Sequence, residues 1–339
     1  MKAVKIIISL VLVAAAAVAG VYAWHYYYDR KVPNFSGVTE LYIYPQTPVD
    51  SVVERICRDS TVKSPSSIRR AFKDVSEVRP GHYTLDPGAT SVYASRMLSL
   101  GWQTPVNLVL SGTMRQEGGI ARKISSQMMM DSLDVIRALR DSVLLAKFGF
   151  TPANVFALII PDTYEVYWTE SMEEVLSRQK KAYDAFWTES NLAKAKARGL
   201  TPMQVSILAS IVKGETNYEP EMPSIAGVYL NRLRIGMKLQ ADPTIAYCFD
   251  YEPSRILRWH LNVDSPFNTY KYAGLPPAPI AVPTKACLNA VLNPDRHAYM
   301  YFCASPEFNG THRFATTYSE HLSNAREFQR ALTLRNKKK

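Results

Sequence analysis

Residues 201–216, TPMQVSILASIVKGET, predict the helix that decides the fold of this chain. Thr201 and Gln204 form a capping-box pattern with a proline in the first turn, so we expect a helix from Pro202 to between residues 213 and 215. At about 100° per residue, Glu215 falls near the middle of the helix's apolar arc. That arc is formed by Val205, Ile207, Leu208, Ile211 and Val212.

Glu215 is the candidate proton donor. A carboxyl held against apolar side chains has its charged form disfavoured, which raises its pKa and keeps a proton available near neutral pH. Two structural alternatives stay open at this point: Glu215 ends a core helix, or it pairs with Arg232 or Arg234 in a structural salt bridge.

The segments that follow are rich in breakers and polar side chains. Residues 217–223 contain two prolines, after which residues 224–234 predict a second amphipathic helix that Gly236 ends. In MKLQADPT (237–244), the Asp-Pro pair indicates a turn or a helix start. SPFNTY (265–270) and the proline-rich GLPPAPIAVP (274–283) come next.

Six segments carry a family resemblance. They are, in chain order, IPDTY (160–164), ASIVKGET (209–216), NRLRIGMKLQADPT (231–244), FNTYKYAGLPPAPI (267–280), AYMYFCA (298–304) and HRFATTYSEH (312–321). Together they resemble the endolytic murein transglycosylases of the YceG-like family, strongly over residues 160–321 and loosely before that.

The resemblance implies a lyase reaction at Glu215. The expected reaction is non-hydrolytic cleavage of the β-1,4 bond between N-acetylmuramic acid and N-acetylglucosamine, which leaves a 1,6-anhydro end. Glu215 would protonate the leaving oxygen and then take the proton from the sugar's 6-hydroxyl. Because that hydroxyl is the nucleophile, the second carboxylate of ordinary glycosidases is not needed, and no cofactor is expected.

Substrate contacts are expected from five polar residues in the matching segments: Gln240, Asp242, Asn268, Thr269 and Tyr270. Alternatives stay open for three of them. Asp242 could cap the helix that begins at Pro243, and Asn268 with Thr269 could only shape a turn.

Three departures from the family pattern concern acids. Lys213 stands where relatives often carry an acid, so Glu215 is the only acid of its helix. Phe156 and Ala157 replace a glutamate and a glycine before PDTY, and Ser111-Gly112 replaces an acid-glycine pair. The last two departures leave the activity plausible, but we expect no role for those acids in this chain.

The N-terminus predicts a transmembrane helix. Lys2 and Lys5 precede a mostly apolar run from Ile6 to Trp24, about 28 Å long at about 1.5 Å per residue, and aromatic residues gather at its end. The alternative is a signal peptide cleaved near Ala17-Val18-Ala19. Family resemblance implies a cell-membrane anchor with the N-terminus in the cytoplasm and the rest in the periplasm or outside the membrane.

Residues 36–104 predict a LysM-like module. A strand at 41–44, a helix capped by Thr47-Pro48-Val49-Asp50 that runs through Arg58, a helix at 65–72 and a strand at 82–85 give the order strand, helix, helix, strand. The family is known to carry such a module. The alternative is a generic small α+β domain without sugar contacts.

The predicted fold class is therefore α+β. Residues 1–28 form the anchor, 36–104 the module, 105–330 a mixed α+β catalytic domain and 331–339 a basic tail. In the catalytic domain we expect a strand at 106–110, helices at 117–130 and 132–147, and a long helix capped by Ser171-Met172-Glu173-Glu174.

Charge and composition limit the classes of partner that we expect for this chain. The net charge of +10 suits anionic lipid or acidic peptidoglycan, whereas an anchored, exported chain without a binding motif does not suit nucleic acid. Cys57, Cys248, Cys287 and Cys303 lack metal-ligand spacing and the histidines are scattered, so we expect no metal; the thiol of Cys303 is expected to be buried on a strand. Peptidoglycan synthases are partners only by family resemblance. The alternative function is a catalytically weak peptidoglycan-binding or scaffold protein of the same fold.

Overall fold

The computed structural model describes residues 2–337 and forms two compact units with a mixed α+β fold. The first unit runs from the N-terminus to Leu108 and adds Gln127–Met129 and Glu165–Glu170. The second contains Val109–Ser126, Met130–Tyr164 and Ser171 to the C-terminus. The predicted α+β class is confirmed.

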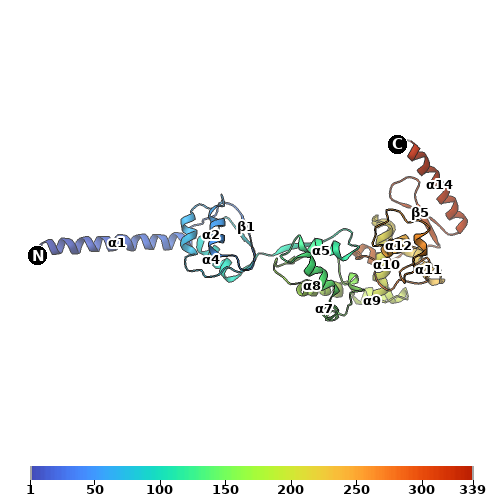
Figure 1. Ribbon diagram of the computed structural model, residues 1–339, viewed down its shortest axis with the longest axis horizontal. Coiled ribbons are helices and arrows are strands. Elements are labelled where there is room, and N and C mark those ends of the chain that lie inside the picture. Colours follow the sequence, from blue (N-terminus) through green and yellow to red (C-terminus); the bar gives the residue numbers. More distant parts are fainter. Residues whose placement is uncertain (1, 338–339) are drawn as a thin grey trace. The chain divides into compact units, whose positions relative to one another are not determined.

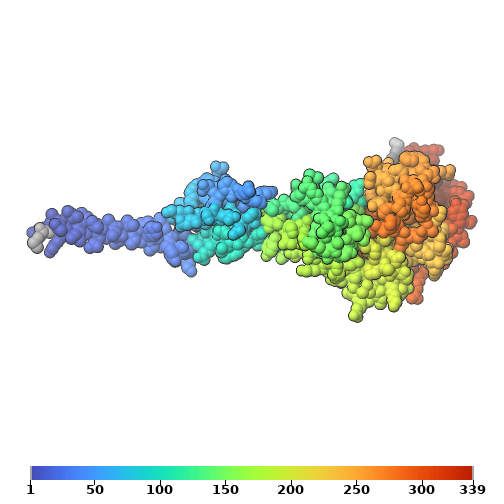
Figure 2. Space-filling view, turned by 60° about the horizontal axis from the view of Figure 1, so that its bottom comes forward, coloured from blue at the N-terminus to red at the C-terminus, as the bar shows by residue number. Residues whose placement is uncertain are grey.

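Helix α1, Lys2–Lys31, is the apolar N-terminal helix (Figure 1). It extends the predicted apolar run by several residues at each end, and the rest of the chain leaves its apolar residues uncovered (Figure 2). By length and composition it could cross a membrane, and a signal sequence shares these properties.

The predicted order strand, helix, helix, strand is present in the first unit. β1 (Thr39–Ile43) and β2 (Gly81–Leu85) are antiparallel, and they are separated by α2 (Val49–Cys57) and α3 (Pro65–Ala71). A further helix, α4 (Ser91–Leu100), was not predicted. Apolar side chains of these elements form one core that includes the buried ring of Tyr83.

The predicted cap of α2 is wrong. Pro48 is the N-cap residue and makes no side-chain bond to the helix. The hydroxyl of Thr47 instead donates a hydrogen bond of 2.7 Å to the carbonyl oxygen of Tyr44, which turns the chain before the helix begins.

The second unit contains most of the helices. β3 (Val106–Leu110) pairs with β4 (Asp162–Val166) in a two-stranded sheet. β5 (Tyr301–Ala304) and β6 (His312–Ala315) form an antiparallel pair. The helices are α5 (Glu117–Ser125), α6 (Ser132–Arg140), α7 (Ser142–Ala146), α8 (Met172–Phe186), α9 (Glu189–Ala197), α10 (Pro202–Glu215), α11 (Met222–Arg234), α12 (Asp242–Cys248), α13 (Lys285–Leu292) and α14 (Tyr318–Lys337), with short 3-10 turns at Val155–Ala157, Glu219–Glu221 and His260–Asn262.

The helices before α8 differ from the prediction. The helix expected at 132–147 is two helices, because the carboxylate of Asp141 accepts hydrogen bonds from the backbone N–H groups of Val143 and Leu144 and starts a new helix. The helix expected to reach residue 130 ends at Ser125. The capping box at Ser171 is confirmed.

Helix α10 lies at the centre of the second unit's core. It packs against α11, α12 and α13, and each of its residues from Val205 to Val212 is buried. The four cysteines, all within the described residues, are free thiols. Cys303 is only partly buried, so the prediction of a buried thiol there is wrong, while Cys287 is fully enclosed.

Candidate active site

The end of α10 carries Glu215. Both hydrogen bonds of the predicted capping box are present: Thr201 accepts from the backbone of Gln204, and the Gln204 side chain accepts from the backbone of Thr201. The helix therefore begins at Pro202 as predicted and ends at Glu215, after which Thr216 is extended. Because the start of the helix is fixed and its apolar face is buried, the position of Glu215 is fixed as well.

A close backbone approach brings a second element to this helix end. A Cβ atom added to Gly214 would lie 2.5 Å from Cβ of Pro243, the second residue of α12. Only a glycine permits this distance. The contact carries the first residue of α12, Asp242, towards the acid.

The carboxyl of Glu215 has one short hydrogen bond. The phenolic hydroxyl of Tyr229, on α11, donates to Oε1 of Glu215 at 2.5 Å. Burial raises the pKa of Glu215 to about 7, the Tyr229 hydrogen bond opposes that rise, and the charge of Asp242 adds to it. Glu215 keeps partial exposure to solvent. A carboxyl with this pKa is partly protonated at neutral pH, and Glu215 is also accessible.

The alternative of a structural salt bridge is not realised in the described part of the chain. The guanidinium of Arg232 is buried and donates to the backbone carbonyls of Met300 at 2.7 Å and Leu239 at 2.5 Å. Arg234 is exposed and donates to Asn231. Arg232 therefore ties α11 to two loops and acts on Glu215 only through its charge, which favours the carboxylate.

Two of the predicted binding residues meet beside the acid. The hydroxyl of Tyr270 donates to Oδ1 of Asp242 at 2.5 Å. Burial raises the pKa of Tyr270, and this hydrogen bond and the charges of Asp242 and Glu215 raise it further. Asp242 is exposed and makes no capping bond to α12, so the capping alternative does not hold. Gln240 is also exposed and has a left-handed backbone with φ of 49°.

Asn268 and Thr269 are buried and use their polar atoms inside the protein. The Asn268 side chain donates to the carbonyls of Leu261 and Val263 and accepts from the backbone N–H groups of Tyr270 and Lys271. The Thr269 hydroxyl accepts from the backbone N–H of Ala241 and lies 2.8 Å from the hydroxyl of Thr244. Both side chains shape the loop that presents Tyr270, which agrees with the turn alternative.

The sequence did not reveal Tyr229 or Arg232 as site residues. Tyr229 shares the apolar face of α11 with Ile225 and Val228, so the pattern indicated only core packing. The position of its hydroxyl depends on how α10 and α11 pack, which local patterns do not specify. At the positions that depart from the family pattern, Lys213 donates to Asn217, and Phe156 is buried.

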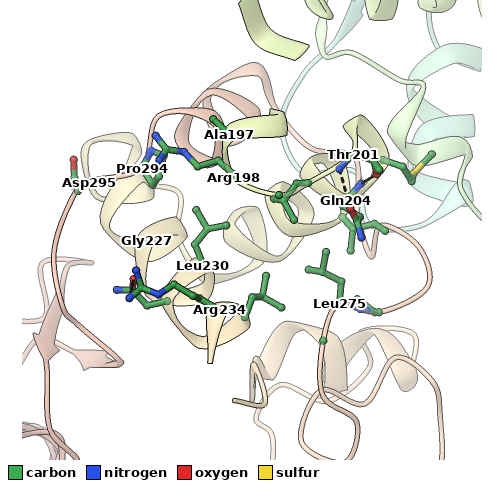
Figure 3. A pocket seen from close by; sticks show the side chains of 18 of the residues that line it. Ala197, Arg198, Thr201, Gln204, Gly227, Leu230, Arg234, Leu275, Pro294 and Asp295 are labelled. Atoms are coloured by element: carbon green, nitrogen blue, oxygen red, sulfur yellow. Dashed lines mark hydrogen bonds between the residues drawn. The ribbon is translucent and has the colours of Figure 1, made fainter. Parts of the chain in front are cut away.

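A separate cavity of about 970 Å³ lies elsewhere in this unit (Figure 3). Its walls come from the turn before α10, from the first turns of α10, from one face of α11 and from two loops; Arg198, Gln204 and Leu230 are among its lining residues. It contains none of the predicted site residues. Within residues 2–337, no group of three or more His, Cys, Asp and Glu side chains could hold a metal ion.

Comparisons with known proteins agree on one family. The model of the YceG-like family matches residues 41–327. An endolytic murein transglycosylase of Bacillus subtilis is 27% identical over 80% of each chain. One of Streptococcus pneumoniae is 22% identical over 94% of this chain and 64% of its own, so this chain spans slightly less than two thirds of that relative.

A solved structure shares the fold. A YceG-like protein of Listeria monocytogenes superposes with a TM-score of 0.57 and 24% identity, over 84% of this chain and 98% of its own. The family match covers most of the sequence and includes every segment that carried the resemblance. The chain therefore belongs to the YceG-like family.

Proposed function

We propose that this protein is a membrane-anchored endolytic lytic transglycosylase that cuts peptidoglycan glycan strands and so limits their length. Two relatives are named endolytic murein transglycosylases, which supports the reaction class. The observation that carries the proposal is the carboxyl of Glu215, enclosed enough to have a pKa of about 7 and open enough to meet a substrate. A protein that only binds or organises glycan has no need of such an acid.

The proposed reaction uses Glu215 twice. Its protonated carboxyl donates the proton to the glycosidic oxygen as the bond from that oxygen to C1 of N-acetylmuramic acid breaks. The oxygen of the 6-hydroxyl of the same sugar then bonds to C1, and its proton returns to the carboxylate. Glu215 ends as it began, no water is consumed, and the product carries a 1,6-anhydro ring.

The hydrogen bond from Tyr229 supports different roles for the two carboxyl oxygens of Glu215. Oε1 accepts the hydrogen bond from the phenolic hydroxyl at 2.5 Å, so we place the transferable proton on the other oxygen, Oε2. The bond also stabilises the carboxylate formed after the first step. Tyr229 is therefore a positioning residue in this proposal.

The five predicted binding residues fall into two groups with different proposed roles. Gln240, Asp242 and Tyr270 have exposed or partly exposed side chains and are proposed to bind the glycan directly. Asn268 and Thr269 are proposed to hold the binding loop in place, because they are buried.

The other segments of the chain are proposed to hold the protein at the membrane and to support the catalytic domain. Helix α1 would anchor the protein in the cell membrane, with the rest in the periplasm or outside the membrane. Residues 36–104 would form a LysM-like module, as the order strand, helix, helix, strand suggests, residues 105–330 the catalytic domain and residues 331–339 a basic tail. Peptidoglycan synthases are proposed partners.

The test of non-hydrolytic cleavage is a digestion of purified glycan strands in water enriched in heavy oxygen. A lytic transglycosylase yields new ends without heavy oxygen, because the nucleophile is the sugar's own hydroxyl. Incorporation of heavy oxygen at every new reducing end would identify a hydrolase and overturn the proposed reaction.

A further inference from the structure

A cavity of about 830 Å³ lies in the first unit where α1 meets the module. The last turns of α1 contribute Tyr26, Tyr27, Arg30 and Lys31 to its wall. The opposite wall includes Tyr93 and Arg96, from α4, and the nearby Trp102. We name this feature the junction pocket. It shares no residue with the candidate active site.

The junction pocket carries an excess of positive charge. Arg30, Lys31 and Arg96 face a single acidic lining residue, Asp86. Among residues 2–337, none of these three cations forms an ion pair, and all three are exposed. Basic residues at the end of α1 also complement the helix dipole, but that effect does not account for Arg96 on another helix.

The aromatic side chains in the pocket remain exposed. Tyr26 is 62% exposed, Tyr93 46% and Trp102 48%, and the guanidinium of Arg30 stacks 3.8 Å from the centre of the Tyr26 ring. Tyrosine and tryptophan with exposed faces beside arginine are typical of the layer of a bilayer that contains the lipid headgroups.

The depth of the pocket follows from the helix itself. If the run from Ile6 to Trp24 spans the hydrocarbon core, residues 26–31 lie about 3 to 10 Å beyond it, at about 1.5 Å per residue. The headgroup layer is about 5 to 8 Å thick on each side. The cations of α1 therefore lie within reach of lipid phosphates.

A buried cluster fixes α1 to the module. The carboxylate of Asp29 accepts two hydrogen bonds from Arg70, at 2.6 and 2.9 Å, and one of 2.5 Å from the hydroxyl of Ser67. Asp29 is only 6% exposed. Because both partners belong to α3, the helix and the module hold one relative position, and the junction pocket is preformed at that depth.

We propose that the junction pocket binds the headgroup of an anionic glycerophospholipid. Arg30, Lys31 and Arg96 contact the phosphate, and the aromatic rings pack against the glycerol and the upper acyl chains. The bound lipid holds the module against the membrane surface. The proposal rests on α1 being an uncleaved anchor, and it does not depend on the reaction proposed for Glu215.

The test uses the full chain in a nonionic detergent, titrated with dioctanoyl phosphatidylglycerol or dioctanoyl phosphatidylcholine and measured by native mass spectrometry. We expect the anionic lipid to bind at least about tenfold more tightly, and Arg96→Gln to weaken its binding about fivefold. Arg58→Gln, which removes an exposed arginine at the end of α2, is the matched control and leaves binding unchanged. Circular dichroism checks that both variants fold.

Four results would overturn the proposal. Equal affinity for the two lipids, or equal binding by the two variants, would remove the anionic headgroup as ligand. Binding of inorganic phosphate that is as tight as binding of the anionic lipid would assign the pocket to a free anion instead. The same spectra give the intact mass of the chain. A mass that shows loss of the apolar run would disprove the uncleaved anchor, on which the argument about the depth of the pocket depends.

Discussion

Tyr229 donates a 2.5 Å hydrogen bond to Oε1 of Glu215, and the two residues lie on different helices, α11 and α10. Tyr229 is itself buried, and its ring packs edge-on against Phe302 of β5. The acid is thus hydrogen-bonded to a residue that is enclosed in the core. This bond lowers a pKa that burial raises, so the protonation of Glu215 reflects a balance of opposed effects.

Removal of this bond should change the pH dependence of the reaction. In the wild type, kcat/KM should fall above pH 7, because the first step needs protonated Glu215. Tyr229→Phe removes the bond that favours the carboxylate, so the falling limb should move to higher pH while kcat drops roughly tenfold. Initial rates between pH 5 and 9 measure both effects.

A matched variant controls for the loss of a tyrosine hydroxyl. Tyr272→Phe removes a hydrogen bond from an exposed tyrosine to Asp264 and should leave the profile of the wild type unchanged. If the falling limb of kcat/KM in Tyr229→Phe lies at the same pH as in the wild type, the hydrogen bond from Tyr229 does not control the protonation of Glu215.

Asp242→Asn should shift the profile in the opposite direction. The negative charge of Asp242 raises the pKa of Glu215, so its removal should lower that pKa and move the falling limb of kcat/KM to lower pH. Tyr270 can still donate to the amide oxygen of the new side chain, which preserves the local geometry. A limb at higher pH than in the wild type would refute the electrostatic role given to Asp242.

Gly214→Ala should damage both stability and activity. The new methyl group would lie 2.5 Å from Cβ of Pro243, and the proline ring cannot move aside without displacing α12. We expect a loss of about 1–3 kcal/mol in the free energy of unfolding, measured by urea denaturation.

A second glycine in a helix provides the comparison. Gly118 of α5 has no heavy atom near the position of an added Cβ, so Gly118→Ala should be neutral or stabilising by up to about 1 kcal/mol. Equal effects of the two substitutions would contradict the close approach of Gly214 to α12.

The raised pKa of Glu215 predicts a pH-dependent stability difference. Between pH 4.5, the ordinary pKa, and about 7, the folded protein retains a proton that the unfolded chain loses, so stability falls as the pH rises through this range. Glu215→Gln lacks this effect. It should be more stable than the wild type at pH 8, by at most about 3 kcal/mol, and equally stable at pH 4. A constant difference across this range, measured by urea denaturation, would argue against the raised pKa.

Local signals in the sequence predicted several elements well. The capping boxes at Thr201 and Ser171 fixed the starts of α10 and α8, because their bonds join residues three apart. Helix α4 was missed although Thr90 caps it and Gly101, with φ of 75°, ends it. Those two signals could have identified it.

Non-local contacts account for most of what sequence reasoning missed. The Thr47 hydroxyl donates to a carbonyl oxygen that precedes the helix, and a capping pattern in the sequence does not predict this partner. Glu215 was identified because it lies on an apolar arc, but its partner Tyr229 is brought to it only by the packing of α10 on α11. Burial of Asn268 depends likewise on the loops around it.

The most direct test of the central claim is the product formed from purified glycan strands by the wild type and by Glu215→Gln, identified by mass spectrometry. We predict internal cleavage to 1,6-anhydro-N-acetylmuramic acid ends by the wild type and a loss of at least about 10³-fold in the variant. Thermal unfolding confirms that the variant is folded. Equal amounts of anhydro product from both proteins would contradict the role of Glu215, and no anhydro product from the wild type would contradict the proposed activity.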